Sequence, residues 1–186
     1  TTTAVGGPAA ALVEAGSEEE LLSAVAAADD AAQHVLLVGG GSNILACEQP
    51  FEGMVVHVAS RGVVVVDEAD SQVLVEVAAG HPWDDVVRET VAQGLAGLET
   101  LAGIPGTAGA TPVQNVGAYG AEVSQTIERV RTWDREERRE RTFGFEELEF
   151  SYRDSALKRS MNAGSPRYVV LSVTFRPVSY THLRAH

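Results

Sequence analysis

The chain has 186 residues, and its 26 acidic against 14 basic side chains give a formal charge of −12. This balance argues against nonspecific binding to nucleic acid, which needs cations to displace phosphate counterions, and against an anionic membrane surface as partner. Apolar residues make up 45% and charged residues 22%, so the chain can bury a core and global disorder is not expected.

The first third of the chain predicts a helix between short parallel strands. Ser17 and Glu20 have the spacing of a capping box, and apolar residues at helical spacing then predict a helix over 18–29. Residues 35–38 form a continuous apolar run, which is typical of a strand buried on both faces of a parallel sheet. Residues 54–58 predict the next strand.

The next segment predicts a hairpin followed by a helix. β-branched runs at 63–66 and 73–77 flank an acidic turn at 67–70. Pro82 at a first helical position, followed by acidic residues, favours a helix start, and Gly94 suits its end. The expected apolar stripe of this helix consists of Trp83, Val86, Val87 and Val91.

The remaining strands predict a mainly antiparallel sheet. They are expected at 127–133, 138–143 and 168–175, and the run 134–141, which mixes both charge signs, is expected to be a solvated hairpin tip. We therefore expect an α+β protein with two α+β subdomains, residues 1–60 and 61–178. Residues 179–186 continue no periodic pattern and are expected to be either a frayed end or a non-native tail.

Cysteine and histidine usage limits the chemistry. Cys47 is the single cysteine, so no internal disulfide is expected, and it is predicted to be a small buried residue. His182 and His186 lie four residues apart but have no third ligand beside them, so no metal site is predicted. The first residues given lack the basic start and apolar stretch that are typical of a signal peptide, and there is no run of about 18 apolar residues, so we expect a cytoplasmic monomer.

The first segment that can carry chemistry is Gly-Gly-Gly-Ser-Asn at 39–43. Three glycines allow a positive φ and a close approach to a ligand, and consecutive N–H groups in such a turn can hold phosphate. The alternative is a tight turn without a ligand. No Gly-Lys-Ser/Thr follows, so the segment is not a Walker loop.

The second segment is the stretch 103–120, with five glycines and two prolines. It has almost no charge, unlike a solvated linker, and therefore indicates a tightly folded loop whose backbone lines a ligand. Thr107, Thr111, Gln114 and Asn115 are neutral hydrogen-bonding groups that suit a heterocyclic ring or a diphosphate. The alternative is a purely structural loop between sheets.

The third segment is Tyr-Arg-Asp-Ser at 152–155. Arg153 is permanently cationic, and its planar fork of donors suits a carboxylate or a phosphate. The alternative is a surface ion pair between Arg153 and Asp154.

Together with Val-Gly-Gly-Pro at 5–8, these segments follow one another in the order and spacing of a known family. The chain resembles the UDP-N-acetylenolpyruvoylglucosamine reductases (UDP-N-acetylmuramate dehydrogenases) over about residues 1–178. The resemblance implies an FAD-binding fold of the PCMH or vanillyl-alcohol-oxidase type. It also implies an oxidoreductase of the second step in bacterial peptidoglycan precursor synthesis, with FAD as cofactor, NADPH as hydride donor and a UDP-sugar as substrate.

The resemblance also implies roles for individual residues. Arg153 would be catalytic, and Tyr152 with Arg153 would contact the substrate. The residues implied to bind FAD are Gly39, Gly40, Gly41, Ser42, Asn43, Ile44, Gly103, Ile104, Pro105, Gly106, Thr107, Gly109, Ala110, Gln114, Asn115, Gly117, Ala118 and Tyr119.

The chain departs from the family after about residue 178. The family's C-terminal domain, which binds the UDP-sugar and supplies a serine proton donor and a late glutamate, is expected to be absent, so we expect a fragment that is inactive alone. Two alternatives stay open. One is a flavin oxidase or dehydrogenase of the wider superfamily, with Cys47 as a candidate for covalent attachment. The other is a non-catalytic flavin-nucleotide-binding module.

Overall fold

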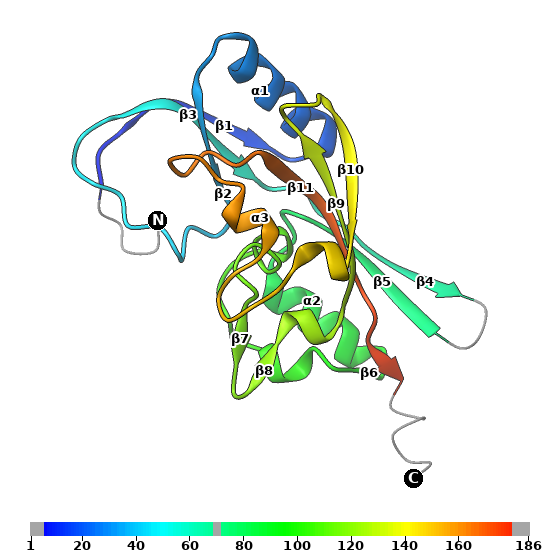
Figure 1. Ribbon diagram of the computed structural model, residues 1–186. Helices are drawn as coiled ribbons and strands as arrows, with labels where there is room; N and C mark the ends of the chain where they lie inside the picture. The colour runs from blue at the N-terminus through cyan, green and yellow to red at the C-terminus, as the bar shows by residue number, and fades with distance from the viewer. Residues whose placement is uncertain (1–5, 69–71, 180–186) are drawn as a thin grey trace.

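The computed structural model describes residues 6–68 and 72–179, which form two main sheets with helices packed against them (Figure 1). The first sheet has the strand order β1-β3-β2, and all its pairs are parallel. Its strands are β1 (Ala9–Ala15), β2 (His34–Val38) and β3 (Phe51–Val58). The predicted parallel arrangement is therefore confirmed.

Helix α1 (Glu18–Asp30) connects β1 to β2 and buries one apolar face. As predicted, the Ser17 hydroxyl caps its start by accepting a hydrogen bond from the Glu20 N–H at 3.1 Å. The Glu20 carboxylate reaches one residue further back than a capping box requires and accepts from the Gly16 N–H at 2.7 Å. The buried residues of α1 are Leu21, Ala24, Val25 and Ala28.

The prediction that strand 35–38 is buried on both faces is wrong in part. Val35 is buried, whereas Leu36, Leu37 and Val38 are half-buried. The C-terminal end of β2 borders a cavity, which Leu36 and Leu37 help to line, instead of a second packed layer.

The second sheet is antiparallel throughout, with the order β10-β9-β11-β5-β4. Its strands are β4 (Val63–Glu68), β5 (Gln72–Ala78), β9 (Ile127–Asp134), β10 (Arg139–Gly144) and β11 (Tyr168–Phe175). Both predicted hairpins are present. Seven of the eight residues of β11 are buried, as expected for the central strand. Residues 69–71 of the predicted acidic turn and the predicted tail from residue 180 lie outside the described residues.

Helix α2 (Trp83–Ala92) begins one residue after Pro82, which is its N-cap and not its first residue. Trp83, Val86 and Val87 are buried as predicted. Val91 is 43% exposed, and the fully buried Thr90 takes the fourth position of the stripe. The hydroxyl of Thr90 is satisfied inside the helix by donating to the Val86 carbonyl at 3.0 Å, so a polar residue can occupy a core position here.

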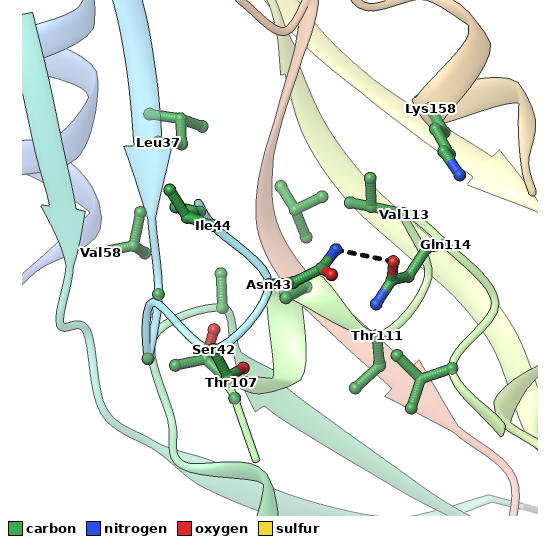
Figure 2. Close-up of a pocket in the computed structure, with 18 of the residues that line it drawn as sticks. Leu37, Ser42, Asn43, Ile44, Val58, Thr107, Thr111, Val113, Gln114 and Lys158 are labelled. Carbon is green, nitrogen blue, oxygen red and sulfur yellow. Dashed lines mark hydrogen bonds between the residues drawn. The ribbon is translucent and has the colours of Figure 1, made fainter. Parts of the chain in front are cut away.

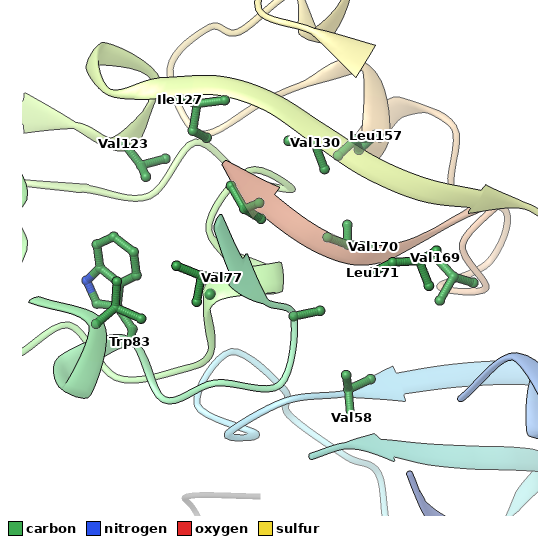
Figure 3. Packing of buried hydrophobic residues seen from close by; sticks show 14 of the residues in the cluster. Val58, Val77, Trp83, Val123, Ile127, Val130, Leu157, Val169, Val170 and Leu171 are labelled. Carbon is green, nitrogen blue, oxygen red and sulfur yellow. The ribbon is translucent and has the colours of Figure 1, made fainter. Parts of the chain in front are cut away.

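Short elements complete the chain between and after these units. They are β6 (Leu95–Ala96), η1 (Glu99–Leu101), η2 (Ala108–Ala110), β7 (Gly117–Ala118), β8 (Ala121–Glu122), η3 (Val123–Gln125), η4 (Glu146–Leu148), α3 (Ala156–Arg159) and β12 (Val178–Ser179). One apolar cluster runs from α1 through both sheets to α2. Figure 3 shows the part of this cluster that includes Val58 of the first sheet and Trp83 of α2. In it the rings of Trp83 and Phe175 lie 5.5 Å apart, and the indole N–H donates to the Leu101 carbonyl at 2.9 Å.

The predicted hairpin tip 134–141 is largely solvated, but its first two residues are not. Asp134 is only 1% exposed, and its carboxylate accepts hydrogen bonds from Arg167, at 3.1 and 2.8 Å, and from the N–H groups of Glu136 and Glu137. Burial alone would raise the pKa of Asp134, but these donors outweigh it and hold the pKa below its ordinary value. The carboxylate therefore fixes the turn from inside.

Ion pairs connect α1 to the β9–β10 hairpin. The most buried pair joins Arg135 to Asp29, with side chains 13% and 18% exposed, and Arg135 also donates to the Ser165 hydroxyl at 2.9 Å and the Pro166 carbonyl at 2.6 Å. Further pairs join Arg131 to Glu18 and Arg138 to Asp30.

The division of the chain into subdomains at residue 60 stays a prediction.

Candidate functional site

A cavity of about 490 Å³ lies where the end of β2, the two glycine-rich segments and the region after the Tyr-Arg-Asp-Ser motif meet (Figure 2). Fourteen of the predicted cofactor-binding residues line it. They are Gly39, Gly40, Gly41, Ser42, Asn43, Ile44, Ile104, Pro105, Gly106, Thr107, Gly109, Ala110, Gln114 and Gly117. Arg153 lines it as well, so all three predicted segments reach one site.

The two glycine-rich segments touch each other at glycines that have no room for a side chain. A Cβ atom on Gly39 would collide with the Thr107 side chain, and one on Gly40 would lie 3.2 Å from the Gly106 Cα. Gly41 has φ +69 and Gly106 φ +134, conformations that non-glycine residues rarely adopt. Glycine is therefore required here both for the close approach and for the turn.

Two side-chain hydrogen bonds also connect these segments. The Ser42 hydroxyl donates to the Pro105 carbonyl at 3.2 Å, and the Asn43 amide donates to the Gln114 side-chain oxygen at 2.8 Å. Figure 2 shows the Asn43–Gln114 pair at the centre of the lining residues, with Thr111 and Val113 close by. The pair places neutral polar groups of both segments at the same point of the cavity.

The second segment is anchored on the connection between β5 and α2. The Ala108 N–H donates to the His81 carbonyl at 2.9 Å, and the Gly109 N–H donates to the Ala79 carbonyl at 2.8 Å. Gly109 packs so tightly that an added Cβ would lie 2.6 Å from the Ala79 Cβ. The middle of the segment is thus a fixed, buried loop, as predicted, although its two ends are exposed.

The third segment forms a tight turn whose tip carries Tyr152 and Arg153. Ser151 and Asp154 close the turn with two backbone hydrogen bonds of 3.1 Å. Arg153 has φ +54 and donates from Nη2 to the Gly117 carbonyl at 2.8 Å, so it contacts the second glycine-rich segment directly. Asp154 pairs with Arg159, whose hydrogen bond holds the pKa of Asp154 below its ordinary value. Arg153 and Asp154 thus bond to other partners and do not form the ion pair that was the alternative for this segment.

Five predicted site residues are not among those that line the cavity. Tyr119 and Tyr152 are 93% and 83% exposed, and Ala118 lies in the short strand β7. The Gly103 N–H donates to the Asp84 carboxylate at 2.9 Å, and Asn115 is buried at 1% exposure with its amide bonded to other protein groups. The resemblance assigns Tyr152 to the substrate and the other four residues to the cofactor, and these roles stay predictions.

The structure adds residues that the sequence analysis did not single out. Lys158 of α3 lines the cavity and donates from Nζ to the Arg153 carbonyl at 2.8 Å. The apolar wall comes from Leu37, Val58, Val113, Leu157, Tyr168 and Val170. Nothing in the sequence spacing of the apolar wall residues distinguishes them from ordinary core residues.

Cys47 is exposed, which corrects the prediction that it is buried. It follows the first glycine-rich segment in an irregular stretch between β2 and β3, where no second layer covers it. It is not among the residues that line the cavity.

The fold matches that of solved flavoproteins. A family model described as an FAD binding domain matches residues 9–142, and the chain belongs to this family. A vanillyl-alcohol-oxidase-type flavoprotein from Myceliophthora thermophila shares the fold, with a TM-score of 0.64 at 16% identity over 89% of this chain and 31% of that one. The predicted fold class is confirmed.

Within this class, the chain is similar to UDP-N-acetylenolpyruvoylglucosamine reductases, which confirms the predicted resemblance. The protein from Cutibacterium acnes is 46% identical over 150 residues, covering 76% of this chain and 39% of the relative. The one from Nocardia farcinica is 53% identical over 134 residues, covering 72% and 32%. The crystal structure of the Thermus caldophilus reductase has a TM-score of 0.74 at 27% identity, covering 96% of this chain and 59% of that one. The chain therefore spans about two-fifths of the curated relatives' length. Among the described residues, no helix is long and apolar enough to span a membrane.

Proposed function

We propose that this chain binds FAD in the cavity between the two glycine-rich segments, as the flavin-binding part of a UDP-N-acetylenolpyruvoylglucosamine reductase. The observation that carries the proposal is the meeting of both segments at one cavity, through the Gly39–Thr107 contact and the Asn43–Gln114 hydrogen bond. The similarity to such reductases supports the choice of activity.

The residues present fit a flavin dinucleotide. A volume of about 490 Å³ lies in the usual range of cofactor sites, roughly 300–1,000 Å³. The glycines at 39–41 line the cavity, where consecutive backbone N–H groups could hold a diphosphate, and Ser42 adds a hydroxyl. Gln114 supplies a neutral polar group for a ring edge, and the apolar wall suits a flat ring system. We therefore place the diphosphate at the first segment and the ring along the second.

The chemistry that bound FAD would supply is hydride transfer from NADPH to the enolpyruvyl double bond of the UDP-sugar, which is completed by a proton from an acid at the adjacent carbon, for peptidoglycan precursor synthesis. The part of this chain in that reaction is electrostatic. Arg153, fixed by the Gly117 carbonyl, presents its remaining guanidinium donors at the cavity, where they can stabilise negative charge that develops on the substrate carboxylate. Tyr152 beside it would contact the substrate. We expect the chain alone to bind FAD without completing turnover, and to act as a cytoplasmic monomer.

The oxidase alternative finds no support at this site. The described residues that line the cavity include neither histidine nor cysteine to bond a flavin covalently. Cys47 is exposed, and its thiol donates a hydrogen bond to the Gln49 carbonyl at 3.8 Å. The oxidases among the structural neighbours are at most 18% identical and bear on the fold alone.

The proposal is tested by adding FAD to the purified chain and following visible absorbance and NADPH oxidation. We expect one bound FAD per chain, released by acid precipitation, and slow reduction by NADPH. Flavin that stays with the acid-precipitated protein would favour the oxidase. A chain that retains FAD but is not reduced by NADPH would favour a non-catalytic binding module.

A further inference from the structure

Asn115 lies in the second glycine-rich segment but faces away from the cavity that its neighbour Gln114 lines. It is 1% exposed, and its backbone has φ +44, a left-handed conformation that asparagine tolerates better than most residues. A primary amide has two N–H donors and one carbonyl oxygen. The surroundings of Asn115 engage all three groups, so the side chain is built into the protein.

These three bonds join separate parts of the chain. Nδ2 of Asn115 donates to the Glu122 carboxylate at 2.8 Å and to the Ser151 carbonyl at 3.1 Å. Its Oδ1 accepts from the Ser124 N–H at 3.2 Å. Glu122 ends β8 and Ser124 lies in η3, so one amide connects these elements to the first residue of the Ser151–Asp154 turn.

The turn and the residue after it also contact the segment on both sides of Asn115. Arg153, at the tip of the turn, donates to the carbonyl of Gly117, and the buried Ser155, which follows the turn, donates to the Val113 carbonyl at 2.6 Å. The region of the turn is thus attached to the segment before, at and after Asn115. Of these attachments, the hydrogen bond from the buried Asn115 side chain is the one that ends on Ser151, the first residue of the turn.

We propose that Asn115 is a positioning residue that holds the Ser151–Asp154 turn and thereby sets where the Arg153 guanidinium lies at the cavity. The functional meaning of this position rests on the proposed role of Arg153. Asn115 itself is not among the residues that line the cavity. This replaces the direct cofactor contact that the resemblance implied for Asn115.

The test compares Asn115→Asp with Asn162→Asp in the whole chain. Asn115→Asp keeps the size of the side chain but loses both donations and places a second charge beside Glu122. Asn162→Asp makes the same chemical change at an exposed turn residue outside the cavity lining. Exchange of the Arg153 side-chain N–H protons with water is followed by NMR in arginine-labelled protein, with Arg153→Lys to identify the signal.

We expect these protons to exchange about fivefold faster in Asn115→Asp, the effect of losing about one net hydrogen bond, and at the original rate in Asn162→Asp. The dissociation constant for FAD should stay within about twofold, because Asn115 lies outside the lining. If Asn115→Asp does not fold, Asn115→Gly accepts the left-handed backbone and removes the same donors.

Unchanged Arg153 exchange in a folded Asn115 variant, or an equal change in Asn162→Asp, would overturn the proposal. So would a large loss of FAD affinity with Arg153 undisturbed, which would make Asn115 a cofactor contact. If the original chain binds no FAD, the proposed function fails, while the exchange measurement still decides the role of Asn115.

Discussion

Gly39 is the residue at which the proposed cofactor site is most sensitive to a single added carbon. Its ideal Cβ would collide with Thr107 Oγ1 and would also lie 3.1 Å from Cγ2 and 3.3 Å from Cβ of Thr107. Rotation of the threonine cannot relieve all three contacts, because its Cβ does not move with the rotamer. Gly39→Ala must therefore push the two glycine-rich segments apart.

The size of the effect follows from this contact. Overpacking a tight contact costs about 1–3 kcal/mol, which corresponds to a loss of FAD affinity of about 5- to 150-fold if the cost falls on the bound geometry. Gly40→Ala meets the Gly106 Cα at the milder distance of 3.2 Å and should lose less. The control is Gly144→Ala in β10, where the new Cβ meets its nearest atom, in Glu147, at an ordinary 3.7 Å.

The assay is titration of each apoprotein with FAD, followed by quenching of flavin fluorescence, with thermal unfolding recorded in parallel. We expect the affinity to fall in the order Gly144→Ala, Gly40→Ala, Gly39→Ala, with the control equal to the original chain. Equal affinity of Gly39→Ala and the original chain would refute the reasoning, because FAD would then not depend on the approach of the two segments.

Three further predictions concern groups outside the two glycine-rich segments. Asp134→Asn should lower the free energy of unfolding by about 1.5–3 kcal/mol at pH 7. Because folding lowers the pKa of Asp134, this stabilisation is present above the unfolded pKa of about 3.9 and is lost as pH falls through the lower folded pKa. In urea unfolding, the difference in stability between Asp134→Asn and the original chain should therefore shrink below about pH 4. Arg135→Ala should cost about 3 kcal/mol in urea unfolding, because it leaves Asp29 partly buried without its partner. Cys47→Ser should bind FAD like the original chain and release it equally on acid precipitation, because Cys47 lies outside the cavity lining.

Each of these predictions has a contrasting outcome. A gap between Asp134→Asn and the original chain that stays constant down to pH 3 would contradict the role of the carboxylate. The control for Arg135→Ala is Arg88→Ala. The Arg88 side chain is 69% exposed, so its ion pairs should contribute less than about 1 kcal/mol to the free energy of unfolding. Equal losses of stability in the two variants would contradict the importance of burial. Acid-stable flavin in the original chain that Cys47→Ser abolishes would restore the covalent oxidase alternative.

The sequence predicted well those features that depend on local chemistry. The Ser17 cap, the glycine stop after α2 and the pairing of β4 with β5 and of β9 with β10 follow from residues near one another in the chain. The meeting of the glycine-rich segments was predicted through the resemblance and not from spacing, because no local pattern shows that Gly39 will lie against Thr107.

What the sequence did not predict depends on which way a side chain faces. Gln114 and Asn115 are chemically alike neighbours, yet one lines the cavity and the other is buried between structural elements. Asp134 belongs to a charged run that suggests exposure, but it is enclosed by Arg167 and two backbone donors. Lys158 reaches the site only because α3 folds back toward Arg153. Such orientations are set by tertiary contacts.

The most direct test of the account is a crystal structure of this chain grown with FAD. The account predicts the diphosphate against the backbone of residues 39–43 and the flavin ring along residues 104–117, with Arg153 still bonded to the Gly117 carbonyl. A structure with the same cavity empty at saturating FAD, or with the dinucleotide bound elsewhere, would contradict it.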